Sequence, residues 1–244
     1  MPIVLVHGVP ETNHLWNGVR ASLARNDVIV LSLPGFGCPR PAGFGSTKEE
    51  YVDWLIGEFE KIGKPVDLVG HDWGGGFTIR VASLRPDLLR SWVSDAAGLS
   101  DVDFEWHEFA KIWQTPGAGE EFWKQQLAMS VDERAATFTS FGVPLAEARD
   151  LTSRIDRTMA DSILALYRSA VDVGREWAPA IKDITTPGLV VIPELDPFLH
   201  ADKAEASAKQ AGSKVVRLAG LGHWWALQDP KRGAEMLTDF WKSL

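Results

Sequence analysis

Cysteine, tyrosine and excess positive charge are all scarce in this sequence of 244 residues. The single cysteine, Cys38, cannot form an internal disulfide. Lys and Arg total 25 against 33 Asp and Glu, which gives a formal net charge of -8. Because nucleic-acid binding calls for clustered basic side chains, no nucleic-acid partner is expected, and a small neutral substrate suits the chain better.

Long hydrophobic runs are also missing. The longest apolar stretches are the length of a strand and fall far short of the roughly 18 residues that span a bilayer, so no membrane segment is expected. The opening MPIVLVHG has neither a basic flank nor a long apolar run, which favours a cytoplasmic protein. No metal-ligand cluster or phosphate-binding loop is found, so no cofactor and no metal are expected. A homo-oligomer is compatible with the sequence but is not indicated by it.

Short apolar runs rich in Val, Ile and Leu recur along the chain and are typical of buried parallel strands. They cover residues 3–6, 28–33, 66–69, 91–96, 189–192 and 215–218. Stretches with helical character lie between most of them, at 16–25, 48–62, 75–84, 201–211 and 232–244. This alternation predicts an α/β fold, a mostly parallel sheet flanked by helices.

The alternation is interrupted from about residue 98 to 183, where Trp, Glu, Lys and Ala dominate and helical periodicity replaces the strand pattern. Thr115–Pro116–Gly117 and Gly142–Val143–Pro144 are typical of turns between short helices. We therefore expect a helical cap at 98–183, inserted between two parts of one α/β core at 1–97 and 184–244.

A glycine-rich turn follows the third expected strand. It reads Gly70–His71–Asp72–Trp73–Gly74 and leads into a helix. Glycines two positions before and after Asp72 allow a strained, tight turn that lifts the central side chain clear of the sheet. This is the nucleophile-elbow pattern with Asp in the place of Ser. Taken alone, the pentapeptide is also compatible with an ordinary turn whose Asp caps the helix.

Two further residues complete a catalytic triad in this interpretation. His223 lies in a loop after the last strand, where it can act as a general base, and Asp196 follows the fifth strand as the natural partner of His223. The order nucleophile, acid, histidine, with each residue directly after a strand, is that of hydrolases with this fold. Asp95, after the fourth strand, is the alternative acid, and Glu194 is a weaker one.

The segment His7–Gly8–Val9–Pro10 follows the first strand directly. The backbone N–H of Val9 could pair there with that of Trp73 to form an oxyanion hole. We interpret His7 itself as structural.

Together these motifs resemble those of the epoxide hydrolases and haloalkane dehalogenases of the α/β-hydrolase superfamily, and the epoxide hydrolases most of all. The HGxP motif is residues 7–10, the GHDWGG motif is residues 70–75, and the GHW…DP ending is residues 222–224 with 229–230. The resemblance spans nearly the whole chain, and the three motifs together are highly specific for this branch of the superfamily.

An aspartate at the elbow suggests attack on a saturated carbon. A serine would form a stable ether there, whereas an aspartate forms an ester that water can hydrolyse. Epoxides and alkyl halides are the obvious substrates. With a reference pKa near 4, Asp72 is expected to be ionised without help. His223 is then free to activate water in the second step, while Asp196 stabilises the imidazolium.

The choice between epoxide and halide depends on the cap, because an epoxide oxygen leaves as an alkoxide and needs a proton donor. Tyr167, in Leu166–Tyr167–Arg168, resembles a ring-opening tyrosine of epoxide-hydrolase caps. The second tyrosine of that family is replaced by Phe109, and we propose that His107 takes its role. The alternative is that Tyr167 is a packed aromatic residue and His107 a solvated histidine.

Haloalkane dehalogenase is the second hypothesis, because Trp73 resembles the indole halide donor of that family, and Trp106 or Trp113 could supply a second donor. Fluoroacetate dehalogenase is less favoured, because Trp73 and Gly76 stand where its carboxylate-binding arginines would be. A non-catalytic ligand-binding protein is the remaining class. Under the epoxide hypothesis the substrate is a small apolar epoxide, and the expected binding residues are Trp73, Trp106, Phe109, Trp113 and Trp224.

Overall fold

The computed structural model describes all 244 residues and has one six-stranded sheet at its centre. Every pair of neighbouring strands is parallel, in the order β2-β1-β3-β4-β5-β6. The strands are β1 (Ile3–Val6), β2 (Val28–Leu31), β3 (Val66–Gly70), β4 (Leu89–Ser94), β5 (Gly188–Pro193) and β6 (Lys214–Leu218). The predicted parallel α/β sheet is therefore confirmed.

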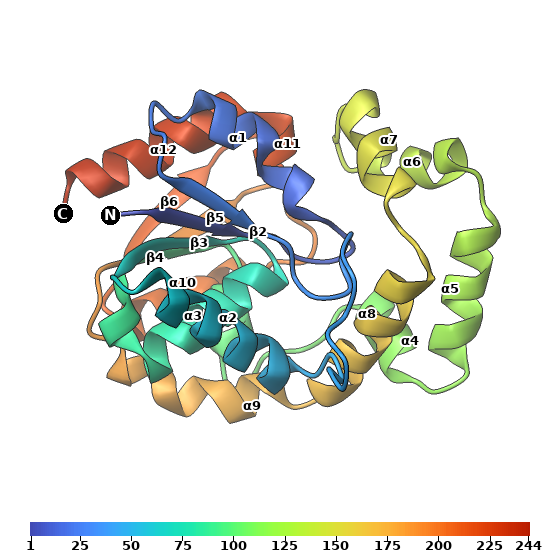
Figure 1. Ribbon diagram of the computed structural model, residues 1–244, viewed down its shortest axis with the longest axis horizontal. Coiled ribbons are helices and arrows are strands. Elements are labelled where there is room, and N and C mark those ends of the chain that lie inside the picture. The colour runs from blue at the N-terminus through green and yellow to red at the C-terminus, as the bar shows by residue number, and fades with distance from the viewer.

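Helices cover both faces of this sheet (Figure 1). One face carries α1 (Asn17–Ser22), α11 (Trp225–Gln228) and α12 (Pro230–Lys242), and the other carries α2 (Lys48–Ile62), α3 (Trp73–Leu84) and α10 (Ala201–Gln210). Strands β1, β3 and β5 are buried along their whole length, as expected when helices cover both faces.

The expected helical stretch between β4 and β5 is present. It contains α4 (Glu108–Gln114), α5 (Ala118–Ala128), α6 (Val131–Ser140), α7 (Leu145–Ser153), α8 (Arg157–Ser169) and α9 (Val173–Trp177). The predicted breaks at 115–117 and 142–144 fall between α4 and α5 and between α6 and α7. Helices α4 to α8 lie together beyond the carboxyl ends of the strands, whereas α9 lies beneath the core helices (Figure 1).

Several predicted boundaries are wrong by a few residues. Strand β4 ends at Ser94 rather than at residue 96, which leaves Asp95 in the loop beyond the strand. The expected helix at 16–25 is a short 3-10 helix, Asn13–Trp16, followed by α1, which ends at Ser22 because Leu23 is extended. By contrast, α2 was predicted with its observed bounds, and its start has a capping box between Thr47 and Glu50.

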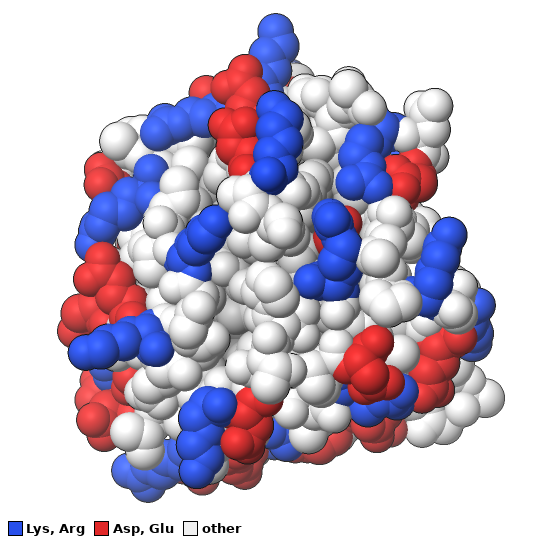
Figure 2. Space-filling model, turned by 90° about the vertical axis from the view of Figure 1, so that its left-hand side faces the viewer, with Lys and Arg blue, Asp and Glu red and all other residues white.

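The surface at the amino ends of the strands carries Lys and Arg side chains interspersed with Asp and Glu (Figure 2). No continuous basic patch covers this face. Mixed signs of this kind do not form the basic stripe that nucleic-acid binding uses. None of the helices is both long enough and apolar enough to cross a membrane.

Replacing Gly70 with Ala is expected to destabilise the fold strongly. A Cβ at this position would overlap the carbonyl oxygen of Gly74 and the hydroxyl of Thr78, so strand and helix would have to separate. Gly57, inside α2, is the matched control, because a Cβ there meets nothing within 4 Å. Gly57→Ala should stabilise the protein by about 0.5–1 kcal/mol. Thermal unfolding of the Gly70→Ala and Gly57→Ala variants measures the two effects. Equal unfolding midpoints for the two variants would contradict the close packing at Gly70.

Candidate active site

The turn between β3 and α3 presents the Asp72 side chain at the carboxyl edge of the sheet. Asp72 has φ 49° and ψ -121°, in the region that non-glycine residues rarely adopt. Its backbone N–H donates to Asp95 Oδ1 at 2.8 Å. A side chain at Gly8 would overlap the Asp72 carboxylate, so a glycine is needed where the loop after β1 passes the elbow.

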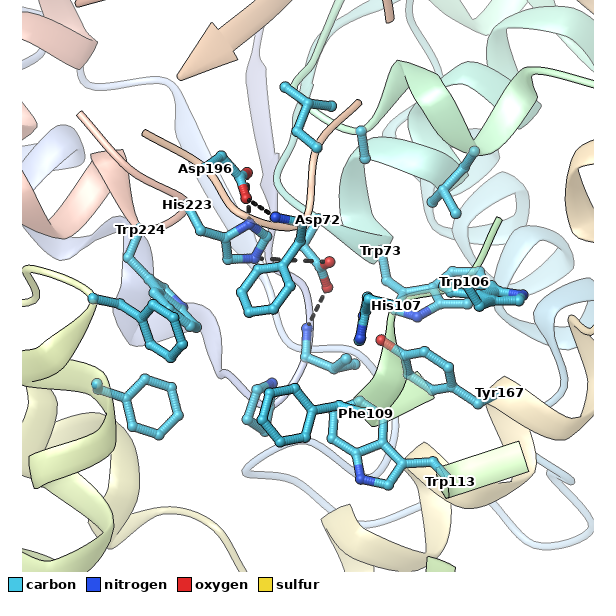
Figure 3. Close-up of a pocket in the computed structure, with 18 of the residues that line it drawn as sticks. Asp72, Trp73, Trp106, His107, Phe109, Trp113, Tyr167, Asp196, His223 and Trp224 are labelled. Carbon is cyan, nitrogen blue, oxygen red and sulfur yellow. Dashed lines mark hydrogen bonds and ion pairs between the residues drawn. The ribbon is translucent and has the colours of Figure 1, made fainter. Parts of the chain in front are cut away.

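The structure brings Asp72, His223 and Asp196 together (Figure 3). The ring of His223 makes a 2.8 Å hydrogen bond from Nδ1 to Asp196 Oδ2, and its Nε2 lies 3.8 Å from Asp72 Oδ1. Asp196 also accepts a hydrogen bond from the N–H of Phe198. In this arrangement Nε2 of His223 faces the carboxylate that the sequence singled out.

The alternative acids predicted for the triad are not in contact with His223. Asp95 Oδ2 lies 2.5 Å from Nδ1 of His71, which is a different histidine, and also accepts from Trp225 Nε1 at 2.6 Å. Glu194 is exposed beyond β5. The physical reason is the loop geometry: Asp95 lies directly behind the elbow, on the side where His71 points.

A buried group beneath Asp72 was missed by the sequence reasoning. His71 and Glu11 are both at most 1% exposed, and Nε2 of His71 lies 3.1 Å from Glu11 Oε1. Glu11 directly follows the HGVP segment and His71 directly precedes Asp72, so their positions beside two recognised motifs were the available signal. The ligand atoms of Glu11, His71 and His223 lie within 4.8 Å of one another. Since hydrogen bonds within the protein already engage Glu11 and His71, we do not interpret this group as a metal site.

One predicted oxyanion-hole donor contacts Asp72, the predicted nucleophile. The N–H of Val9 donates to Asp72 Oδ2 at 2.9 Å. The N–H of Trp73 belongs to the first turn of α3, where backbone donors are free of helical partners, and its role as the second donor stays a prediction. His7 is buried and its Nε2 accepts from the N–H of Leu33, which fits the structural role expected of it.

A cavity of about 290 Å³ opens in front of Asp72 and is lined mostly by apolar and aromatic side chains. All the residues predicted to bind substrate or to act from the cap lie in its wall: Trp73, Trp106, His107, Phe109, Trp113, Tyr167 and Trp224. Arg134, Phe138, Phe141 and Phe198, which the sequence reasoning did not name, line it as well. The cavity thus lies between the α4–α8 helices and the carboxyl edge of the sheet.

Tyr167 and His107 lie next to each other in the wall of this cavity. Their ring centroids are 6.4 Å apart, and the Tyr167 hydroxyl points toward Trp73 and the Asp72 side of the cavity (Figure 3). His107 caps α4, with Nδ1 accepting the N–H of Ala110 at 3.2 Å, so its proton is on Nε2 when the ring is neutral. Burial lowers the pKa of His107 to about 4, which keeps the ring neutral near pH 7.

The tryptophans of the cavity differ in whether their indole N–H groups are free. Trp106 Nε1 donates to the carbonyl of Ala170 at 2.9 Å and is not free. The indole nitrogens of Trp73 and Trp113 have no hydrogen-bond partner, but that of Trp113 points away from Asp72 (Figure 3). Of the three candidate halide donors, only Trp73 lies close to Asp72, and its indole also interacts with the Tyr167 hydroxyl. Phe109 lies at the exposed side of the wall.

Burial changes the acid-base properties of the site. It raises the pKa of Asp72 from its reference value near 4 to about 6, so the carboxyl group remains mostly ionised near pH 7. Burial alone would lower the pKa of His223, but the Asp196 carboxylate outweighs it and the pKa is raised. Burial and the nearby charge of Asp72 together raise the pKa of Tyr167 well above 10.

Asp72→Asn is expected to stabilise the folded protein at pH 7 and above. The folded-state pKa of Asp72, about 6, exceeds the ordinary unfolded value near 4. Its ionisation therefore costs the folded state up to about 3 kcal/mol above pH 6, and this cost disappears as the pH falls to about 4. Urea unfolding of both proteins from pH 4 to 8 measures the difference. Asp53→Asn, on the exposed side of α2, is the control, and a gain independent of pH would contradict the assignment.

Comparisons with known proteins assign the family. A family model described as the alpha/beta hydrolase family matches residues 3–236. "Haloalkane dehalogenase 2" of Mycobacterium tuberculosis (strain ATCC 25618 / H37Rv) is 36% identical over 96 residues, which are 38% of this chain and 33% of that protein. The match thus spans about a third of that relative. A 2-hydroxymuconate semialdehyde hydrolase of Pseudomonas sp. (strain CF600) is 25% identical over 98% of this chain and 86% of its own length.

Solved structures share the fold over the full chain. A Pseudomonas aeruginosa protein described as a "putative epoxide hydrolase" has a TM-score of 0.79 and 20% identity, covering 99% of this chain and 88% of that one. Haloalkane dehalogenase DbeA of Bradyrhizobium elkani USDA94 has a TM-score of 0.74 and 20% identity, with coverages of 100% and 92%. Because the family model covers nearly the whole sequence, the chain belongs to the alpha/beta hydrolase family.

Proposed function

We propose that this hydrolase converts a small apolar epoxide to a vicinal diol through a covalent ester on Asp72. The observation that carries the proposal is the placement of two groups in the wall of one cavity: the Asp72 carboxylate, and the Tyr167 hydroxyl turned toward its side of the cavity. A nucleophile and a proton donor on either side of a bound epoxide are what ring opening requires.

In the first step, Asp72 Oδ1 attacks an epoxide carbon. Oδ2 is held by the N–H of Val9, which leaves Oδ1 as the free oxygen. The new C–O bond forms as the ring C–O bond breaks, and the alkoxide takes the proton of Tyr167. Ester formation also removes the negative charge that raises the pKa of Tyr167, so the phenol becomes a better donor as the reaction proceeds.

His107 has a different role in this scheme. Because its ring is neutral, its Nε2–H can donate a hydrogen bond to the epoxide oxygen, but giving up that proton would leave an imidazolate. Tyr167 is therefore the proton donor and His107 a hydrogen-bond donor that helps to hold the oxygen. This division of roles follows from the N-cap contact of His107.

In the second step, Nε2 of His223 takes a proton from water, and the resulting hydroxide attacks the carbonyl carbon of the Asp72 ester. The oxyanion is stabilised by the N–H groups of Val9 and Trp73, and Asp196 stabilises the imidazolium. Collapse expels the alkoxide, which takes the proton of the new carboxyl group, and the imidazolium proton restores the Tyr167 hydroxyl. The sum is epoxide plus water giving diol, with Asp72 again a carboxylate.

The division into a core and a cap belongs to the same proposal. Residues 98–183 would form the cap, which supplies His107 and Tyr167, and residues 1–97 and 184–244 would form the core, which supplies the triad. Because the substrate would lie between the cap and the core, bulk water would be kept away from it during ring opening.

Haloalkane dehalogenation is the second candidate function, supported by the position of Trp73 beside Asp72 and by the dehalogenases among the relatives. A halide leaves as a stable anion and needs N–H donors rather than a proton. Trp106 is unavailable as the second donor because it is bonded to Ala170. Fluoroacetate dehalogenation is less favoured, because no arginine follows Asp72 in α3 before Arg80.

These candidates can be tested directly with two substrates, styrene oxide and 1-bromobutane. Each is offered separately, and the diol and the bromide produced are measured. We expect diol from the epoxide. Bromide without diol would replace the epoxide assignment by the dehalogenase, and neither product would favour a ligand-binding role for the fold.

His223→Gln is expected to accumulate the covalent ester on Asp72, because ring opening needs no base whereas ester hydrolysis does. Intact-mass analysis after mixing with epoxide should show an adduct of the mass of the substrate. Asp72→Asn serves as the control and should show none. Normal turnover by the His223 variant would exclude its role in activating water.

Tyr167→Phe is expected to slow ring opening about 100-fold or more while changing ester hydrolysis much less, since the phenol acts in the first step. Single-turnover kinetics separate the two rates. Tyr51→Phe is a matched control: its hydroxyl donates to the carbonyl of Pro34 in the core, so removing it should reduce stability by about 1 kcal/mol without slowing ring opening. Equal slowing of both steps by Tyr167→Phe would contradict the donor role.

A further inference from the structure

A single arginine, Arg134, lies in the wall of the cavity and has no role in the scheme above. It belongs to α6, and the rest of the cavity lining contains no Lys and no other Arg. The residue is only 8% exposed. A buried arginine keeps its positive charge, and in protein interiors such a charge is normally paired with a carboxylate. The partners of Arg134 therefore decide what its charge can do.

The partners of Arg134 are backbone carbonyls and include no carboxylate. Nη1 donates to the carbonyls of Gln126 and Met129, and Nη2 donates to the carbonyl of Thr152. These carbonyls lie at the carboxyl ends of α5 and α7, which carry only partial negative charges. The Nε atom is buried and has no hydrogen-bond partner. The contacts thus hold the guanidinium in place without neutralising its full charge.

The only other buried Lys or Arg of the chain has carboxylate partners. Lys48, at the start of α2, is 4% exposed, and its Nζ lies 2.6 Å from Glu49 and 2.8 Å from Glu176. The charge of Lys48 is thus neutralised within the protein, whereas that of Arg134 is not. A charge that is removed from water without an opposite charge is unfavourable, and a carboxylate supplied by a ligand would compensate it.

The side chains around Arg134 also suit an anionic group. Thr137 and Phe138 follow Arg134 by three and four positions, so the three residues share one face of α6, and all of them line the cavity. Gln126, in the last turn of α5, lines it as well. The hydroxyl of Thr137 and the amide of Gln126 can both donate hydrogen bonds to a carboxylate. This corner of an otherwise apolar cavity is therefore polar and positively charged.

Arg134 and the proposed proton donor lie at different ends of the cavity. Phe138, one helical turn after Arg134, contacts the ring of Trp224, with ring centroids 5.0 Å apart. Trp224 lies on one side of Asp72 and Tyr167 lies on the other (Figure 3). A substrate whose epoxide is bound between Asp72 and Tyr167 can therefore extend along the cavity toward α6, where Arg134 would meet its far end.

We propose that Arg134 forms an anion-binding subsite, and that the substrate is an apolar epoxide with a carboxylate group at its far end. The substrate class rests on the proposed function, whereas the binding of an anion does not depend on the reaction. One arginine matches the single charge of a carboxylate, whose two oxygens suit the planar guanidinium. The net charge of -8, which favours a neutral substrate, is a property of the whole chain, whereas Arg134 acts inside the cavity.

Calorimetric titration with two ligands of similar shape tests this subsite in the unmodified protein. The ligand 3-phenylpropanoate has a carboxylate, and 3-phenylpropanamide has a neutral amide in the same position. At low salt and a pH of about 8, we expect the carboxylate to bind at least about 10-fold more tightly, because only the carboxylate makes a charge-assisted contact with Arg134. Equal affinities, or tighter binding of the amide, would overturn the proposal.

Arg134→Met tests whether Arg134 is the source of this preference. The variant should bind the carboxylate about 10-fold more weakly and the amide with little change. Binding of the amide also shows that the cavity of the variant is intact. Arg149→Met is the matched control, because Arg149 is an exposed arginine of α7 that pairs with Asp132 outside the cavity. An unchanged preference in Arg134→Met would overturn the proposal, and the titration of the unmodified protein remains decisive if this variant does not fold.

A second pair of compounds extends the test to the reaction. The epoxide 4-(oxiran-2-yl)benzoate differs from styrene oxide only by its carboxylate, and we expect its kcat/KM to be at least about 10-fold higher. In Arg134→Met the two kcat/KM values should become similar. Equal values in the unmodified protein, or a preference for styrene oxide, would overturn the substrate class. Absence of diol from both epoxides would refute the proposed function but leave the calorimetric result standing.

Discussion

The geometry of the site depends on the close approach of two backbone loops, at Gly8 and at Asp72. Because Gly8 has no side chain, the loop after β1 can pass against the Asp72 carboxylate, and the next N–H reaches Oδ2 at 2.9 Å. The left-handed backbone of Asp72 turns the carboxylate toward that loop. If the loops were farther apart, the N–H of Val9 could not hold Oδ2 of Asp72, and the orientation of the carboxylate would no longer be fixed.

Two histidines next to each other in space have different surroundings because their partners differ. His71 contacts two carboxylates and no solvent, whereas His223 has one carboxylate behind it and the cavity in front. The two carboxylates raise the pKa of His71 well above 6.5, and Asp196 raises the pKa of His223. In both cases the environment, rather than the residue type, determines the protonation state.

Local patterns in the sequence predicted the sheet, the bounds of α2 and the elbow, because apolar runs, capping residues and glycines act over a few neighbouring positions. Asp196 was correctly predicted as the partner of His223, but the sequence alone could not exclude Asp95. Asp95 and Asp196 both follow strands of one sheet, and only the paths of the loops decide which histidine each one reaches. The raised pKa of Asp72 depends on burial, which is a property of the whole fold.

The aromatic wall of the cavity has an optical consequence. Trp73, Trp106, Trp113, Trp123 and Trp224 line it, so five of the eleven tryptophans lie around the space in front of Asp72. Indole emission responds to nearby charge and polarity, and neutralising a carboxylate within this group would alter both. The tryptophans thus form an intrinsic fluorescent reporter of charge and polarity in the cavity, which requires no added label.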